Sequence, residues 1–250
     1  MAIVDKPSDY FVSNLHTGNG GTLNITSLDF QPDLVWVKER NNAKDHAWYD
    51  SVRGANQLLE SNKTTTDSTT SAGISSFNSD GWTTGNFFQT NDNGDSYVSW
   101  NWKAGTSFTN DASATGIGSI DSTGSVNDTA GFSICTHTGT GSLGTIKHGL
   151  STKPSVILTK ERSEARDWIM YHHKNTSAPA TDFLLLNKTD ATVDDNNFMN
   201  DTEPTSSVFT VKGFSEVNKV SQTYVSYIFS ERQGYSKFGS YTGNGNADGT

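Results

Sequence analysis

The chain has 250 residues and a formal net charge of −9, with 32% hydrophobic, 11% aromatic and 18% charged residues. This acidic balance argues against nucleic acid as a partner, because neutralising phosphates requires clustered Lys and Arg. A low hydrophobic fraction with many aromatic residues favours small aromatic cores under a polar surface, which is typical of an all-β extracellular or virion-type protein rather than a helical enzyme.

The N-terminal residues 1–10 lack the basic segment followed by an apolar segment that marks a signal peptide. No apolar run approaches about 18 residues, so no membrane insertion is expected. We therefore expect synthesis in a cytoplasm, and we interpret residues 1–10 as a short N-terminal attachment arm.

Short apolar or alternating runs bounded by Gly, Asn, Asp and Pro predict strands. They lie at residues 34–37, 97–102, 156–159, 208–211 and 224–229. The run at 97–102 alternates, so Tyr97, Ser99 and Asn101 share one face and the residues between them share the other. Helical periodicity is nearly absent, and only residues 50–59 could form one helical turn.

Residues 106–130 are rich in Ser, Thr and Gly, without long apolar periodicity. This composition predicts a linker. An alternative is a polar hairpin that packs against a neighbouring unit, because Ile117 and Ile120 are spaced for some burial.

The segments on either side of this linker resemble each other at several anchors that keep their order. The pairs include FVSNLHTGNG (11–20) with FSICTHTGTG (132–141), QPDLVWVKER (31–40) with KPSVILTKER (153–162), and SYVSW (96–100) with TYVSY (223–227). Ordered matches over about a hundred residues predict two independent domains rather than a solenoid.

We therefore expect an all-β chain of two tandem antiparallel β-sandwich or jelly-roll-like domains, at residues 11–105 and 131–234. The ending FGSYTGNG (238–245) resembles the start of both copies. Residues 235–250 are accordingly expected to be the first strand of a third repeat, and the natural polypeptide to continue beyond them, because a lone strand cannot bury its own apolar face.

The sequence offers no catalytic, cofactor-binding or metal-binding residues. The glycine pattern at 139–144 matches a dinucleotide fingerprint but leads to no helix. The turn at 91–95 resembles half a calcium loop without its closing glutamate, and the neighbours His172 and His173 would point to opposite faces of a strand. Cys135 is the only cysteine, which excludes an intrachain disulfide, and we expect it to be a small buried hydrophobic residue.

Three aromatic residues and one arginine are the best candidates for contact with a ligand or partner: Trp48, Tyr49, Trp82 and Arg53. Trp48 and Tyr49 follow the repeated Lys-Glu-Arg segment, and Trp82 follows a turn. Exposed aromatic rings stack on sugars, whereas buried rings would simply fill a thin sandwich. Arg53 belongs to a Ser-Val-Arg-Gly segment that only the first copy contains.

The segments QPDLVWVKERNNAKDHAWYDSVRGANQLLESN, SSFNSDGW and DSYVSWNWKAG, with EPTSSVFTV and YVSYIF in the second copy, give the chain a family resemblance. It resembles a repeated domain of unknown function in structural and tail-fibre proteins of tailed bacteriophages, especially marine ones. The resemblance covers nearly the whole chain, and it supplies no catalytic residues.

The resemblance implies a non-enzymatic virion protein, made in the cytoplasm of a host bacterium. We expect a tail fibre or similar appendage, whose N-terminal repeats attach to the particle and whose distal part faces the host. Its partners would be other virion proteins of the tail or capsid, further copies of itself, with a trimer favoured, and a host surface glycan. Alternatives are a capsid decoration or head-fibre protein, a free glycan-binding module, and a polysaccharide depolymerase.

Overall fold

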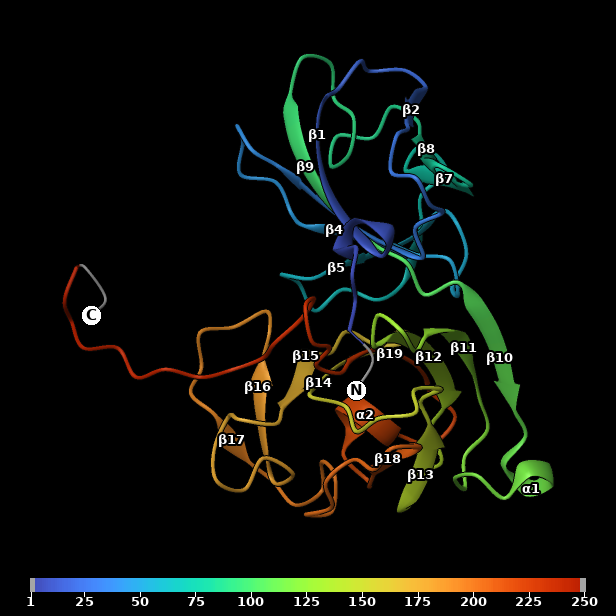
Figure 1. The fold of residues 1–250 in the computed structure, drawn as a ribbon, viewed down its shortest axis with the longest axis vertical. Helices are drawn as coiled ribbons and strands as arrows, with labels where there is room; N and C mark the ends of the chain where they lie inside the picture. The colour runs from blue at the N-terminus through green and yellow to red at the C-terminus, as the bar shows by residue number, and fades with distance from the viewer. Residues whose placement is uncertain (1–2, 248–250) are drawn as a thin grey trace.

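The structure is a computed structural model that describes residues 3–247, and it confirms that the chain is all-β (Figure 1). The nineteen strands of this described part fall into four sheets. The helical elements are single turns: η1 (Pro7–Asp9), α1 (Ala112–Thr115) and α2 (Ser215–Asn218). Between residues 3 and 247, no helix is long and apolar enough to cross a bilayer.

A six-stranded sheet forms the centre of the first half. Its order is β1 (Phe11–Thr17), β9 (Ser96–Trp102), β3 (Leu34–Glu39), β4 (Ala47–Asp50), β5 (Gln57–Glu60) and β6 (Ser68–Thr69). A small sheet accompanies it, in the order β2 (Leu23–Ile25), β8 (Gly81–Thr84) and β7 (Ile74–Asn78). The strands predicted at 34–37 and 97–102 are therefore confirmed as β3 and β9. The helical turn considered for residues 50–59 does not form, because β5 starts there.

An eight-stranded sheet forms the centre of the second half. Its order is β10 (Thr106–Asn110), β11 (Ser122–Asn127), β12 (Phe132–Thr138), β19 (Thr223–Phe229), β14 (Val156–Glu161), β15 (Trp168–His172), β16 (Asp182–Leu185) and β17 (Val193–Asp194). Its small companion sheet pairs β13 (Gly144–Lys147) with β18 (Val208–Val211). The three strands predicted in this half are confirmed as β14, β18 and β19.

The two large sheets share one strand order. The first sheet reads β1, β9, β3, β4, β5, β6, and the second reads β12, β19, β14, β15, β16, β17 after its first two strands. Each small sheet pairs the strand that follows β1 or β12 with the strand that precedes β9 or β19, namely β2 with β8 and β13 with β18. The order of the strands along each half therefore follows the order of the sequence anchors.

The prediction that residues 106–130 form a linker is wrong, and the hairpin alternative describes them. β10 pairs with β11, and β11 pairs with β12 over six residue pairs, so the segment extends the second sheet. Ile120 is buried and joins the core of that half. Polar sequence misleads here because the ladder satisfies the backbone, while Thr106, Ser107, Thr109 and Thr123 remain exposed at the surface.

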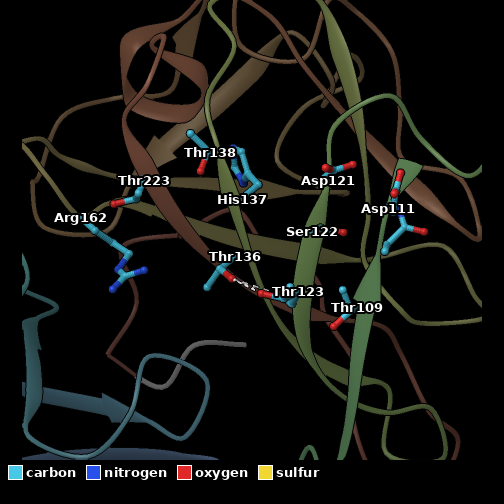
Figure 2. Close-up of a pocket in the computed structure, with 11 residues that line it drawn as sticks. Thr109, Asp111, Asp121, Ser122, Thr123, Thr136, His137, Thr138, Arg162 and Thr223 are labelled. Carbon is cyan, nitrogen blue, oxygen red and sulfur yellow. Dashed lines mark hydrogen bonds between the residues drawn. The ribbon is translucent and has the colours of Figure 1, made fainter. Parts of the chain in front are cut away.

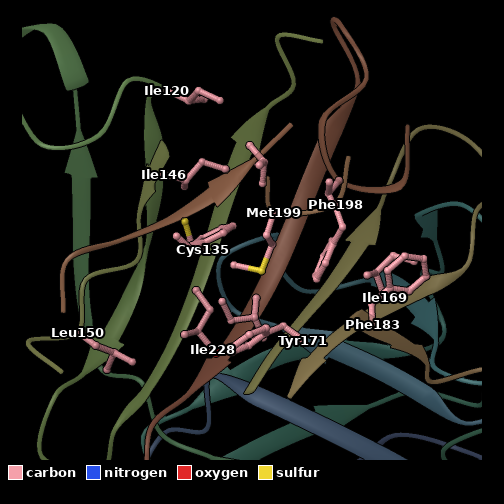
Figure 3. Packing of buried hydrophobic residues seen from close by; sticks show 14 residues of the cluster. Ile120, Cys135, Ile146, Leu150, Ile169, Tyr171, Phe183, Phe198, Met199 and Ile228 are labelled. Atoms are coloured by element: carbon pink, nitrogen blue, oxygen red, sulfur yellow. The ribbon is translucent and has the colours of Figure 1, made fainter. Parts of the chain in front are cut away.

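The four sheets stack as four layers, and one hydrophobic cluster fills each of the three spaces between neighbouring sheets. One cluster lies between the small and large sheets of the first half, and another lies between those of the second half (Figure 3). The third joins the two large sheets. Successive residues of β14 show the alternation: Val156 and Leu158 belong to the shared cluster, and Ile157 belongs to the cluster of its own half.

We call the shared set the interlayer cluster; its buried members are Leu34, Trp48, Leu59, Ala104, Phe132, Ile134, Val156, Leu158, Trp168, Val225 and Tyr227. The Trp48 ring lies 5.4 Å from the ring of Trp168 and 4.9 Å from that of Tyr227. Trp168 also donates its indole N–H to the Glu60 carbonyl at 3.0 Å. The expectation of two independent domains is therefore wrong, because both halves share this buried core.

The N-terminal residues of the described chain pack against residues 233–235, which precede the C-terminal segment. Val4 is buried, and its backbone N–H donates to the Gln233 carbonyl at 3.0 Å. The Tyr10 and Tyr235 rings meet edge to face at 6.2 Å. The expected arm therefore packs partly on its own chain. The strand expected over residues 235–250 does not form within 235–247, and residues 248–250 lie outside the described residues.

A stacked histidine and tyrosine occur at the same place in each half. His16 stacks on Tyr97 at 5.0 Å between ring centres, and His137 stacks on Tyr224 at 4.9 Å. The His137 ring is nearly inaccessible, and its Nε2 lies 3.0 Å from the Val217 carbonyl. Burial lowers the pKa of His137 to about 4. Both rings therefore support the ends of their sheets as neutral groups near pH 7.

Acidification should destabilise the protein through His137. Because its pKa is about 4 when folded and 6.5 when unfolded, the unfolded state takes up more protons as the pH falls from 6.5 towards 4. The free energy of unfolding should drop by roughly 2 kcal/mol per such histidine at pH 5. Urea titrations at pH 7 and pH 5 measure this, and His137→Gln should lose less stability between them than the wild type. Equal losses would contradict the assignment.

Each half also has a fully buried glutamate directly after a lysine, and the two carboxyl groups differ in their hydrogen bonds. The Glu161 carboxylate accepts the backbone N–H groups of Ser163 and Glu164 at 2.8 Å. Neither carboxylate oxygen of Glu39 accepts a hydrogen bond from any described residue. A buried carboxyl group without a hydrogen-bond partner opposes folding, whereas one that accepts backbone N–H groups supports it.

The two glutamates should therefore respond oppositely to the same change. Glu161→Gln is expected to lower the free energy of unfolding by about 1–3 kcal/mol, because it weakens hydrogen bonds to a charged acceptor. Glu39→Gln should leave that free energy unchanged or raise it, since the Glu39 carboxyl group has no hydrogen bond to lose. Chemical denaturation of both variants compares them directly, and a larger loss in Glu39→Gln than in Glu161→Gln would contradict this account.

Candidate functional site

Trp48 and Arg53, two of the four candidate contact residues, lie at the boundary between the halves. Trp48 is 2% exposed and packs in the interlayer cluster. The Arg53 side chain is completely buried. It donates to the carboxylates of Asp50 and Asp67 and to the Trp48 carbonyl. These residues contact the other half of their own chain rather than solvent.

Tyr49 and Trp82 lie inside the first half, and neither is exposed. The Trp82 indole N–H donates to the Asn101 side-chain oxygen at 2.9 Å. Burial raises the pKa of the Tyr49 hydroxyl well above its usual value. The expectation that an aromatic platform is exposed at Trp48, Tyr49 or Trp82 is therefore wrong in this structure, because all three fill cores.

A charged network surrounds Arg53 at the boundary. Asp67 binds Arg53 at 2.7 Å with one oxygen and Arg162 at 2.8 Å with the other, so one carboxylate joins both halves. The hydroxyl of Tyr227 donates to Asp50 at 2.6 Å. Burial alone would lower the pKa of Arg53, but Asp50, Tyr227 and Asp67 together raise it above its usual value. The network holds the halves together, and a ligand cannot reach it in this arrangement.

The turn at 91–95 is also structural. The buried Asn91 side chain donates to the carbonyls of Gly21 and Gly85 at 2.7 and 2.9 Å. It thereby ties the glycine loop after β1 to this turn. Among the described residues, no group of three or more His, Cys, Asp or Glu side chains is placed to hold a metal ion.

A polar groove of about 370 Å³ lies on the surface of the second half (Figure 2). Its floor is a row of threonines on three adjacent strands, in which Thr109 of β10 lies opposite Thr123 of β11, and Thr123 lies opposite Thr136 of β12. The hydroxyls of Thr123 and Thr136 hydrogen-bond at 2.9 Å. The other lining residues are Asn110, Asp111, Asp121, Ser122, His137, Thr138, Arg162 and Thr223.

The charged groups of the groove are already held by the protein. Asp111 caps α1 and accepts the Ser113 hydroxyl at 2.6 Å, and hydrogen bonds from Ser113 and the Ala114 N–H lower its pKa. It therefore stays ionised at neutral pH and cannot serve there as a proton donor. His137 is neutral and turned into the core, and Arg162 is bound to Asp67. The groove can offer hydroxyls, carboxylates and one guanidinium for hydrogen bonding to a polar ligand.

Sequence reasoning missed this groove because two of the three strands of its floor, β10 and β11, lie in the segment interpreted as a linker. The signal was the Ser/Thr-rich run before the second copy, in which Thr123 and Ser125 alternate along a strand. Alternation of polar residues with the small Gly124 gives a weak strand signal in a single sequence. Only the pairing with β12 brings the three threonines into one row.

A family model described as a domain of unknown function (DUF7483) matches residues 6–250. The chain belongs to this family. The DUF7483 match runs through both halves and through residues 106–130, in keeping with a segment that is part of the second sheet. No curated protein and no solved structure matches the chain.

Proposed function

We propose that this DUF7483 protein is a non-enzymatic structural component of a tailed-bacteriophage particle, most simply a tail fibre or similar appendage. The observation that carries the proposal is the union of the two halves into one four-layer body. A buried aromatic cluster joins them, as do the contacts of Asp67 with Arg162 and of Asp50 with Tyr227 in the charged network. Such a body can transmit load between its ends without a disulfide, which suits a part assembled in a reducing cytoplasm.

We further propose that the halves are diverged copies of one β-rich unit. The shared strand order of the large sheets, the matching small sheets and the paired His16–Tyr97 and His137–Tyr224 stacks support this. Duplicated units are a common way to build extended particle components, because each unit supplies the same kind of surface for its neighbour. In this chain, the copies have gained a common core.

Gold labelling of purified particles tests the location of the protein. Antibodies raised against residues 1–250 should label the tail or its fibres in negatively stained particles of a phage that encodes the chain. Label on the capsid shell would favour a decoration or head-fibre protein, the principal alternative. Intact, purified particles that contain none of this chain by mass spectrometry would overturn the structural role.

A second candidate function, glycan binding, is favoured by the threonine row of the groove. Hydroxyls in a regular row can hydrogen-bond the hydroxyls of a host surface polysaccharide. Replacing Thr123 and Thr136 together by valine keeps the shape and removes both hydroxyls. Each lost hydrogen bond is worth about 0.5–1.5 kcal/mol, so the affinity should fall about tenfold.

Titration calorimetry with purified host polysaccharide measures that affinity. Thr202→Val, at an exposed site outside the groove, is the control and should bind like the wild type. Equal affinities of the wild type and the double variant would remove the groove as the binding site. New reducing ends in the polysaccharide after incubation would indicate a depolymerase and would contradict the non-enzymatic proposal.

A further inference from the structure

The outer edge of β1 is the longest open sheet edge in the described part of the chain. β1 pairs with β9 through seven continuous residue pairs, without a bulge, and no described strand pairs with its other side. The other terminal strands are shorter: β10 has five residues, and β6 and β17 have two each. Short edges are a common defence against unwanted strand pairing.

β1 also lacks the residues that usually protect an edge. Its sequence FVSNLHT contains no lysine, proline or acidic residue, and Leu15 is 63% exposed on it. The one titratable side chain, His16, stacks on Tyr97, and burial lowers its pKa, so it adds no charge near pH 7. An uncharged edge of this length without a bulge is a template for the addition of another strand.

The second half shows what kind of segment fits such an edge. Its corresponding strand is β12, and β11 covers the outer edge of β12 through six residue pairs. β11 reads STGSVN, an uncharged run of small and polar residues. In its register, Thr123 lies opposite Thr136 and Gly124 lies opposite Cys135. The first half has no counterpart of β11 among the described residues.

Residues 239–247 have the same character and belong to no sheet. They are exposed along their whole length, contain no charged residue and extend away from the body (Figure 1). Residues 242–246 read TGNGN, whereas residues 123–127 of β11 read TGSVN. Three of these five positions are identical, including the glycine that lies at the centre of the β11 pairing.

We propose that residues 241–246 of one molecule add as an antiparallel strand to the outer edge of β1 of a second molecule. The β11 register transferred to β1 places Thr242 opposite Leu15 and Gly243 opposite Asn14. The added strand pairs the open backbone groups of β1 and covers part of Leu15. This inference rests on the proposed structural role and names its partner, a second copy of this chain.

The segment cannot occupy the edge of its own β1 in this register. Phe238 and Phe11 line the same small apolar cavity, so residue 238 lies near the start of β1. Tyr241 would have to lie opposite His16, five residues along the strand, or roughly 16 Å away. Three residues of chain reach at most about 11 Å. Donation to another molecule is therefore head-to-tail and propagates along a line of copies.

The first test compares two substitutions of Thr242, both in an exposed segment on which the fold does not depend. The full chain, at about 0.15 M salt to screen its net charge, should gain mass with concentration in multi-angle light scattering. Thr242→Pro removes a backbone N–H and should reduce this association at least tenfold, whereas Thr242→Val keeps the N–H and should not. A wild type that stays monomeric at 100 µM (about 0.1 mM), or equal association of all three proteins, would overturn the proposal.

The second test reads the register through disulfide trapping. Molecules with Leu15→Cys are mixed with molecules that carry Thr242→Cys, and oxidation should give a mixed dimer, because cross-strand neighbours lie within disulfide reach. The native Cys135 is buried and should not react. Leu15→Cys mixed with Val220→Cys, another exposed position, is the matched control. Equal yields in both mixtures would overturn the register. Neither readout depends on where the protein lies in a particle, so failure here leaves the gold-labelling result untouched.

Discussion

Replacement of Arg53 by methionine is expected to lower the free energy of unfolding by about 3–5 kcal/mol. The guanidinium is completely buried and binds the carboxylates of Asp50 and Asp67. Without it, these carboxylates remain in the interior with one partner fewer, and the cost of burying charge is no longer offset. Urea denaturation followed by tryptophan fluorescence measures the loss.

Two controls separate charge from fit. Arg53→Lys keeps the charge but cannot reproduce the fork of hydrogen bonds, so it should also be clearly destabilised. Arg166→Met removes a partly exposed ion pair with Glu164 and Glu216 and should cost at most about 1 kcal/mol. If Arg53→Met unfolds at the same urea concentration as Arg166→Met, the network does not join the halves as the geometry indicates.

Replacement of Trp168 by alanine should have an effect of similar size, about 3–5 kcal/mol. Its ring is fully buried between the two large sheets, against Trp48 and Tyr227, and its indole N–H is hydrogen-bonded to Glu60. The deletion leaves a cavity in the core that both halves share. The wild type should therefore unfold in one calorimetric transition, and Trp168→Ala should separate the halves into two.

The matched control is Trp100→Ala, because Trp100 lies on β9 of the first half, is half-buried and is not part of the interlayer cluster. It should lower the stability less and leave a single transition. Two transitions in the wild type itself would contradict the shared core and restore the picture of independent domains.

The strands themselves could be predicted from local pattern. Residues 34–37, 97–102 and 156–159 are strands because β-branched and aromatic residues recur there between turn residues. The burial of Cys135 follows from the usual behaviour of a free cysteine, and it is confirmed. The alternation over β9 was also correct, but which of its faces is inner was not predictable. The buried face carries Ser99 and Asn101. The Asn101 side chain can be buried there because its oxygen accepts the Trp82 indole N–H and its amide nitrogen donates to a backbone carbonyl of β1.

The candidate contact residues could not be placed from the sequence. An aromatic residue after a charged segment fits an exposed platform and a core equally well, because hydrophobic pattern does not say what lies on the second face of a sheet. Here that face meets another large sheet, so Trp48 and Arg53 are interior. The threonine groove could not be predicted either, because a polar strand has the same composition as a linker and only its hydrogen-bonding partners distinguish the two.

By itself, the sequence determined the all-β class, the positions of the main strands, the absence of an intrachain disulfide and the resemblance between the halves. These follow from properties of neighbouring residues: alternation, turn chemistry and composition. Only the tertiary structure decided that the large sheets share a core, that residues 106–130 complete the second sheet, and that β1 keeps an open edge. These depend on contacts between residues far apart along the chain, and local periodicity carries no information about which distant surface covers a given face.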